Sequence, residues 1–209
     1  MAKDLPIGKL LRECGYHSDA AQAAGHAALL AAGITREGKE RIVEWKRPDA
    51  IAVLKARVTL LCAPCRDAGL GGDHPDAVTA GAGDRCVVCE GSATRRGALI
   101  LIRACRRARF HRIIFVGGSP DIHRELPLLL GGDLDVRIVD GMTARPGRDV
   151  QREIDGCDVV VLLGSTEISH TVSATWAGPK TVATQSRGIS AFLLEAAEKI
   201  EARADRAGL

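Results

Sequence analysis

Aromatic residues are scarce in this chain, at 3% of its 209 residues. A protein with few aromatic rings has no platform on which unpaired nucleobases can stack, so the composition argues against a dedicated single-strand binder. No apolar run approaches eighteen residues, which argues against a membrane-spanning helix. The N-terminal segment MAKDLPIGKLL lacks the apolar core of a signal peptide. We therefore expect a cytoplasmic protein with no membrane partner.

The sequence also lacks the HExxH, Walker A and GxSxG motifs and any paired-carboxylate arrangement. A serine-histidine combination is present at Ser165, Ser169 and His170. Adjacent Ser-His residues at the start of a helix do not present the two groups to each other, so this is a weak nucleophile-base pair. Catalysis is therefore the alternative hypothesis: an enzyme acting on a nucleotide or sugar-phosphate, with His170 as acid or base.

Charge is nearly balanced over the whole chain but concentrated in one segment. The formal net charge of +3 is too small to imply a nucleic-acid partner by itself, and a hydrophobic content of 46% is that of a globular protein. Residues 91–112, in contrast, contain seven arginines and no acid, a local charge of +7. Such a concentration needs solvent, acidic partners or phosphates nearby.

Four of the seven cysteines follow the spacing Cys-x2-Cys-x20-Cys-x2-Cys. They are Cys62, Cys65, Cys86 and Cys89. Two separated thiolate pairs are typical of a closed tetrahedral site, so we expect a structural Zn²⁺ and not a catalytic one. The alternative is four unrelated buried cysteines.

The remaining cysteines and one histidine have simpler interpretations. Cys14, Cys105 and Cys157 are expected to be small core residues. The segment between the two cysteine pairs is rich in Gly, Asp and Pro and is predicted to be a loop that the metal closes. His74, in this loop, could replace a ligand, although a solvated histidine is the simpler interpretation.

Residues 5–61 are predicted to form three or four short helices. Ser18 is expected to cap a helix over residues 19–32 that ends at Gly33. Thr35 is expected to cap a second helix, TREGKERIVEW, and Pro48 to begin a third that runs up to Cys62. Short helices with tight turns are compatible with a helix-turn-helix, but a helical bundle with a solvated charged face explains the pattern more simply.

A basic helix is predicted over residues 94–108, because apolar residues recur there at helical spacing. The candidate nucleic-acid-binding residues on it are Arg95, Arg96, Arg103, Arg106 and Arg107. One interpretation is a phosphate-binding ridge beside the zinc site, and the other is a solvated helix on the outside of a sheet.

From Arg112 onward, strands and helices alternate. Strands are predicted at residues 113–116, 135–139, 158–163 and 181–184, and helices at 120–130, 149–154, 168–176 and 188–203. This order predicts an α/β fold, a small Rossmann-like parallel sheet preceded by an α-helical region and a four-cysteine zinc module. The expected domains are residues 1–61, 62–94 and 95–209.

Polar residues follow each predicted strand. The candidate ligand-binding residues are Gly117, Gly118, Ser119, Asp140, Ser165, Ser169, His170, Ser186 and Arg187. The carboxyl ends of parallel strands meet at one edge, where a glycine turn and a helix N-terminus suit an anionic or nucleotide-like ligand. The same residues could instead be turn glycines and helix caps.

The stretches RIIFVGGSPDIHRELPLL, DVVVLLGSTEISHTVSATW and TVATQSRGISAF, with Asp140, resemble the bacterial group known as domain of unknown function 2325. The resemblance covers roughly residues 112–195. It implies a Rossmann-like fold with a double glycine at Gly117-Gly118 and a Ser-His pair at Ser169-His170, but no reaction. The segment CVVCEGSATRR resembles a zinc-ribbon or treble-clef knuckle.

Together these patterns predict a zinc-binding accessory or regulatory protein with two partners: DNA or RNA on the basic helix, and a small anionic ligand in the Rossmann-like domain. An assembly module that forms a homo-oligomer and binds neither is a further alternative.

Overall fold

The computed structural model describes residues 4–72, 74 and 76–207, and the chain forms two compact units, Met1–Ser92 and Ala93–Leu209. Below they are called the first and the second unit. The three-part division predicted from the sequence stays a prediction. Within the described ranges, no helix is both long enough and apolar enough to cross a membrane.

In its described residues the first unit has four α-helices, and the first three of them surround a small aliphatic core. Its elements are β1 (Asp4–Pro6), α1 (Ile7–Glu13), α2 (Asp19–Ala31), β2 (Arg41–Val43), the 3₁₀ helix η1 (Glu44–Lys46), α3 (Arg47–Arg57), β3 (Leu60–Cys62), α4 (Ala63–Asp67) and β4 (Val78–Ala80). The Ser18 hydroxyl accepts the N–H of Ala21 and caps α2, and Gly33 follows that helix with φ +70°. Both features were predicted, and the helical N-terminal region is confirmed.

The helix predicted over residues 35–45 is wrong. Gly38 has φ +73°, a left-handed conformation that breaks a helix, and Ile42 lies in the strand β2. That strand pairs antiparallel with β1, where Ile42 lies opposite Leu5. Because the partner lies far away in the sequence, the local spacing of Ile42 and Trp45 is not enough to make a helix.

Two further elements of the first unit differ from the predictions. The helix that begins near Pro48 ends at Arg57, and the chain continues as β3. The segment predicted as a loop contains β4, which pairs parallel with β3. This pairing matters for the site, because Cys62 is the last residue of β3.

The second unit is an α/β domain, which confirms the predicted fold class. Its elements are α5 (Ala93–Arg107), β5 (Arg112–Val116), α6 (Pro120–Leu130), β6 (Asp135–Val139), α7 (Gly147–Gly156), β7 (Val159–Leu163), α8 (His170–Trp176), β8 (Thr181–Thr184) and α9 (Ile189–Ala207). The four strands are parallel and lie in the order β6-β5-β7-β8.

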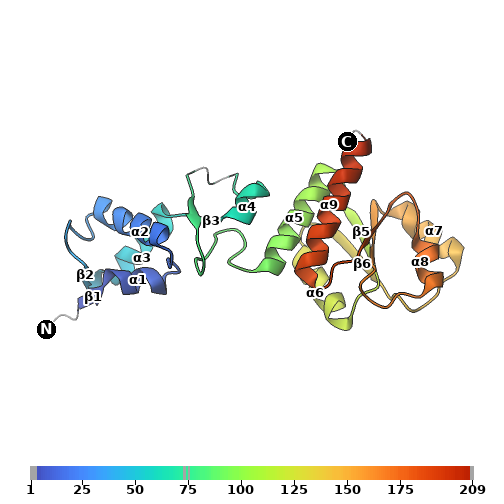
Figure 1. The fold of residues 1–209 in the computed structure, drawn as a ribbon, viewed down its shortest axis with the longest axis horizontal. Coiled ribbons are helices and arrows are strands. Elements are labelled where there is room, and N and C mark those ends of the chain that lie inside the picture. Colours follow the sequence, from blue (N-terminus) through green and yellow to red (C-terminus); the bar gives the residue numbers. More distant parts are fainter. Residues whose placement is uncertain (1–3, 73, 75, 208–209) are drawn as a thin grey trace. The chain divides into compact units, whose positions relative to one another are not determined.

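Helices cover both faces of this sheet (Figure 1). Ile113 and Phe115 of β5 point to the face covered by α5, α6 and α9, whereas Ile114 and Val116 point to the face covered by α7 and α8. Phe115 meets Phe192 of α9 edge to face, with ring centroids 6.4 Å apart. The continuous apolar runs in the sequence therefore reflect strands that are buried on both sides.

The outer strand β6 has a mixed character. Asp135 and Arg137 are exposed, while Val136 and Ile138 pack partly against the core. The side chain of Arg137 contacts Glu153 of α7 at 2.9 Å.

Candidate metal centre and other candidate sites

Short local elements of the first unit position the four cysteines. Cys62 ends β3, and Cys65 lies in the first turn of α4. Cys86 and Cys89 lie in a turn after β4, and the N–H of Val87 donates to the carbonyl oxygen of Leu60 at 2.8 Å. That hydrogen bond connects the second cysteine pair to β3, the strand that carries Cys62.

The four sulfur atoms lie within 4.8 Å of one another, and three of the four residues are buried. The Sγ atoms of Cys62 and Cys89 are 3.8 Å apart, which is too long for a disulfide. Four sulfurs at about 2.3 Å from one ion in a tetrahedron lie about 3.8 Å from each other. The donor set and its spacing therefore fit a zinc-like ion, and the cluster can hold one metal.

The surroundings favour a thiolate at Cys86. Burial opposes ionisation of this thiol. The backbone N–H groups of Cys62, Cys89 and Val88 outweigh that effect and lower its pKa to about 6. Burial and hydrogen bonds from the neighbouring thiols raise the pKa of Cys65. A bound metal would displace the protons that remain.

The apolar cluster around these cysteines is small, with the cysteines themselves making up most of it. Its members are Leu61, Cys65, Ala77, Cys86 and Cys89, with Cys62, Leu70 and Val88 at its border. A cluster of this size buries too little apolar surface to order the segment between the cysteine pairs without metal. His74 is not among the ligand groups that cluster in the described residues.

The other three cysteines lie apart from the metal cluster. Cys105 and Cys157 are buried in the second unit, as predicted, and burial raises the pKa of Cys105 to about 12. Cys14 is only half-buried, and burial raises its pKa as well.

At the carboxyl edge of the sheet, the double glycine has a packing explanation. The N–H of Gly118 donates to the hydroxyl of Thr166 at 2.9 Å. A Cβ on Gly117 would lie 2.9 Å from the side chain of Ile168. Both glycines have positive φ, +91° and +101°. The loop between β7 and α8 thus lies against the turn after β5.

Several predicted ligand residues serve as caps or turn acceptors. Ser119 and Ser169 accept backbone N–H groups at the starts of α6 and α8. Asp140 accepts the Thr143 hydroxyl at 2.5 Å and the N–H of Met142 at 3.2 Å, and these bonds lower its pKa. Their ligand-binding role stays a prediction.

Of the remaining predicted residues, Ser165 lies in the loop after β7, His170 begins α8, and Ser186 and Arg187 lie between β8 and α9. Ser165 and Ser186 are partly exposed, and His170 and Arg187 are exposed. His123, which the sequence did not single out, lies with its Nε2 3.0 Å from the carbonyl oxygen of Gly117. It sits one turn inside α6, where a lone histidine gives no signal of its own.

Helix α5 has the predicted periodicity, and its arginines differ in environment. Arg106 forms an ion pair with Asp133, and Arg107 forms one with Glu201 at 3.2 Å. Arg95 is exposed, whereas Arg96 and Arg103 are half-buried. Gly97 lies against α9, where an added Cβ would be 3.0 Å from the carbonyl oxygen of Ser190. One flank of α5 is therefore committed to packing within the second unit.

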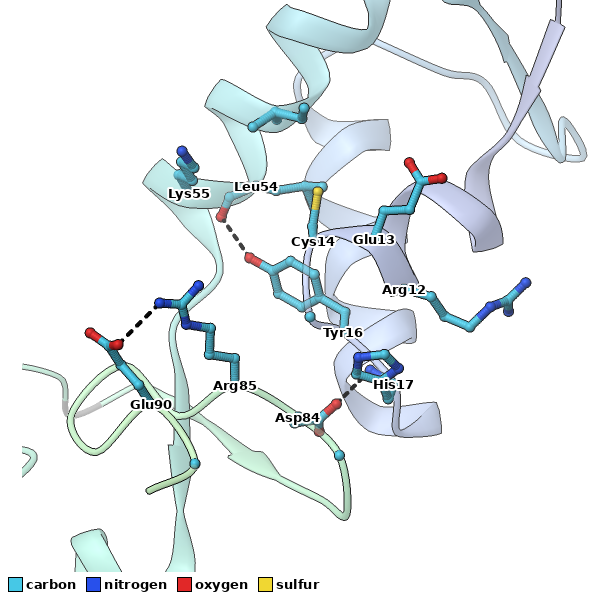
Figure 2. Close-up of a pocket in the computed structure, with 14 residues that line it drawn as sticks. Arg12, Glu13, Cys14, Tyr16, His17, Leu54, Lys55, Asp84, Arg85 and Glu90 are labelled. Carbon is cyan, nitrogen blue, oxygen red and sulfur yellow. Dashed lines mark hydrogen bonds and ion pairs between the residues drawn. The ribbon is translucent and has the colours of Figure 1, made fainter. Parts of the chain in front are cut away.

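A cleft in the first unit was not predicted (Figure 2). Its volume is about 690 Å³, and the residues around it include Tyr16, Lys55 and Arg85. They come from the turn after α1, from α3 and from the segment just before Cys86. Because these three segments are far apart in the sequence, no local pattern indicates that they meet.

Comparison of the chain with protein-family models, with curated proteins and with solved structures gives no match. No family is assigned. No family match therefore supports the resemblance to domain of unknown function 2325. The Rossmann-like parallel sheet and the four-cysteine cluster predicted from the sequence are both present.

Proposed function

We propose that the first unit holds one structural Zn²⁺ through Cys62, Cys65, Cys86 and Cys89. The observation that carries this proposal is the convergence of four sulfur atoms within 4.8 Å. Thiolates are the ligands that zinc prefers in closed sites, and four of them leave no coordination position for a substrate. The metal would fasten α4 and the Cys86–Cys89 turn to β3.

Metal analysis of the purified full-length chain tests the proposal. We expect about one zinc per chain, and a cobalt-substituted protein with the absorption of a tetrahedral thiolate site. Cys86→Ser should lose most of the metal, whereas Cys157→Ser, which changes a buried cysteine of the second unit, should keep it. Wild-type protein without stoichiometric metal after purification in zinc-containing medium would rule the site out.

We also propose that α5 contacts DNA or RNA, which would make the protein an accessory or regulatory factor. The support is the charge of the segment from Gly91 to Arg112, together with the exposure of Arg95, Arg106 and Arg107. Contacts to phosphates would make the affinity fall steeply with salt and depend little on sequence.

The triple variant Arg95→Gln, Arg106→Gln, Arg107→Gln tests this nucleic-acid contact. We expect weaker binding to duplex DNA and to RNA, with a shallower dependence on salt. Changing the exposed Arg36, Arg57 and Arg148 to Gln is the matched control, because it removes the same charge from elsewhere. Equal binding by the two triple variants would refute the assignment to α5.

For the sheet, we propose a small anionic ligand at the carboxyl edge, between the loops after β5 and β7. This is where the strand order reverses direction around β5, the position at which doubly wound sheets bind ligands. His170 and Ser119 are exposed there. Titration of the protein with inorganic pyrophosphate, followed by amide chemical shifts, should move the signals of Gly117–Ser119 and His170 saturably. Unchanged shifts at millimolar pyrophosphate would remove this proposal.

A further inference from the structure

The cleft in the first unit has the size and the walls of a small-molecule site. A second hollow, of about 310 Å³, shares Cys14, Tyr16, Lys55, Arg85 and Glu90 with it. Because they share these residues, the two hollows are adjacent, and they are called the two lobes of the cleft. The volume of the larger lobe alone lies within the usual range for small-ligand pockets.

Every acidic group that lines this cleft already has partners. Glu13 contacts Arg47 at 3.0 Å and Lys9 at 3.8 Å. Glu90 contacts Arg85 at 3.1 Å. The carboxylates are therefore poorly placed to bind a cationic ligand.

Asp84 is the most fully satisfied of these acids. It accepts the backbone N–H groups of His17, Ser18 and Gly81 and the hydroxyl of Ser18. Its side chain therefore holds the wall of the cleft and has little capacity left for a ligand.

The basic groups differ. Within the part of the chain that the structure describes, neither the ammonium of Lys55 nor the guanidinium of Arg12 has an ion pair or hydrogen bond. Arg85 uses Nη2 for Glu90 and keeps the other donors of its guanidinium. Lys55 and Arg85 line both lobes. The unsatisfied charge in the cleft is therefore positive.

Apolar atoms form the inner wall. Leu54 is fully buried and Tyr16 is 6% exposed. The single hydrogen of the Tyr16 hydroxyl faces two carbonyl oxygens, that of Leu54 at 3.3 Å, drawn in Figure 2, and that of Val58 at 3.4 Å, which fixes the ring against α3. The half-buried Ile51 and Cys14, with the small part of the Tyr16 ring that is exposed, offer a surface for an apolar or aromatic body.

We propose that this cleft binds a small organic anion: a phosphate or carboxylate held by Lys55 and Arg85, on an apolar body that packs against Tyr16 and Ile51. This site belongs to the first unit and is separate from the sheet edge of the second. A ligand with an anionic group and an apolar body would contact the basic side chains and the apolar wall at the same time.

The same site is coupled to the metal. Arg85 directly precedes Cys86, and Glu90 directly follows Cys89. The N–H of Arg85 donates to the carbonyl oxygen of Gly15 at 3.1 Å, which joins the knuckle to the opposite wall of the cleft. A metal that orders the knuckle therefore orders Arg85. By linkage, bound anion and bound metal stabilise each other. The coupling rests on the proposed zinc site, whereas the anion site does not.

Phenyl phosphate is the probe, because it combines a dianion with an aromatic ring. We expect a saturable shift of the amide signals of Gly15, Arg85 and Gly91 when the metal-loaded full-length chain is titrated with it. Benzoate in a parallel titration distinguishes carboxylate from phosphate recognition. Either ligand binding at these residues supports the site.

Variants assign the charges. Lys55→Met and Arg85→Met should each weaken binding about 10-fold or more, the loss expected for one charge-assisted hydrogen bond. Lys55→Arg keeps the charge and should stay within about 3-fold of the wild type. Lys39→Met, which changes a lysine in a different hollow, is the matched control and should have no effect.

Four results would overturn the proposal or one of its parts. The anion site would be refuted if about 10 mM probe, enough to reveal weak millimolar binding, gave no saturable shift. It would also be refuted if Lys55→Met and Lys39→Met bound the probe with equal affinity. Unchanged affinity after chelation would end the coupling alone. A chain that never binds metal would refute the zinc proposal, and the anion titration would still decide the cleft.

Discussion

Asp84 holds the residue that caps α2: its Oδ2 accepts the hydroxyl of Ser18 at 2.5 Å, while Ser18 Oγ accepts the N–H of Ala21 at 3.2 Å. Asp84 is 8% exposed and lies two residues before Cys86. One carboxylate therefore links the helices of the first unit to the segment that carries the second cysteine pair. Removing these hydrogen bonds should lower the free energy of unfolding of the first unit.

Asp84→Asn should destabilise the first unit by about 1–3 kcal/mol, because an amide offers one acceptor oxygen where the carboxylate accepts four donors. Urea unfolding of metal-loaded protein measures the loss. Asp205→Asn, an exposed aspartate of α9, is the control and should change the free energy of unfolding by less than about 0.5 kcal/mol. Equal stability of the two variants would contradict the role of Asp84.

Metal removal should act locally. Chelation should increase amide hydrogen exchange in residues 60–91, because the small cluster around the cysteines loses the ion that closes it. Residues 112–116 and 159–163 are central strands buried on both faces and should keep their protection. Loss of protection in the strands at the same rate would show that the two units unfold together.

The turn after β5 should be intolerant of side chains. Gly117→Ala places a Cβ 2.9 Å from Ile168 in a residue with φ +91°, so we expect a loss of about 1–3 kcal/mol in stability. Gly132→Ala is the matched control, since no atom lies within 4 Å of its added Cβ. Thermal unfolding measures both. A Gly117→Ala protein as stable as Gly132→Ala would contradict the packing explanation.

Acid should weaken the turn between β8 and α9. The ammonium of Lys199 and the N–H groups of Ser186 and Gln185 contact Glu195 and lower its pKa to about 2, from an ordinary 4.5. The folded state thus binds this proton more weakly than the unfolded chain. Its stabilisation is present above about pH 4.5 and is lost as the pH falls toward 2.

Melting temperatures from pH 7 to pH 2 test that expectation. The gap between wild type and Glu195→Gln should narrow below about pH 4.5. Glu198→Gln, an exposed glutamate on the same helix, should run parallel to the wild type. A gap that stays constant over the whole range would contradict the assignment.

The sequence predicted best what depends on neighbours in the chain. Strands β5 and β7 were readable because each is an apolar run covered on both faces, and α2 because Ser18 and Gly33 mark its ends. The cysteine spacing predicted the cluster, because the two ligands of each pair in a zinc site are close together in the sequence and the spacing is therefore visible there.

The features that the sequence did not predict depend on contacts between residues far apart in the chain. β2 became a strand because Ile42 pairs with Leu5, and nothing near Ile42 announces that partner. Ligand binding at the double glycine stays a prediction, and the Thr166 hydroxyl that accepts the N–H of Gly118 lies too far away in the sequence to be foreseen. The cleft beside the knuckle needs Tyr16, Lys55 and Arg85 to meet, and only the tertiary structure brings them together.

The outer strand β6 carries a further consequence. Its unpaired backbone would be a template for a strand from another molecule, and such edges lead to aggregation when they are flat and apolar. Asp135 and Arg137 are exposed along this edge, so an incoming strand would have to pack beside the Asp135 carboxylate and the ion pair of Arg137 with Glu153. These charged side chains therefore oppose the pairing of this edge with another molecule. A variant with valine at both positions should precipitate at concentrations where the native sequence stays in solution.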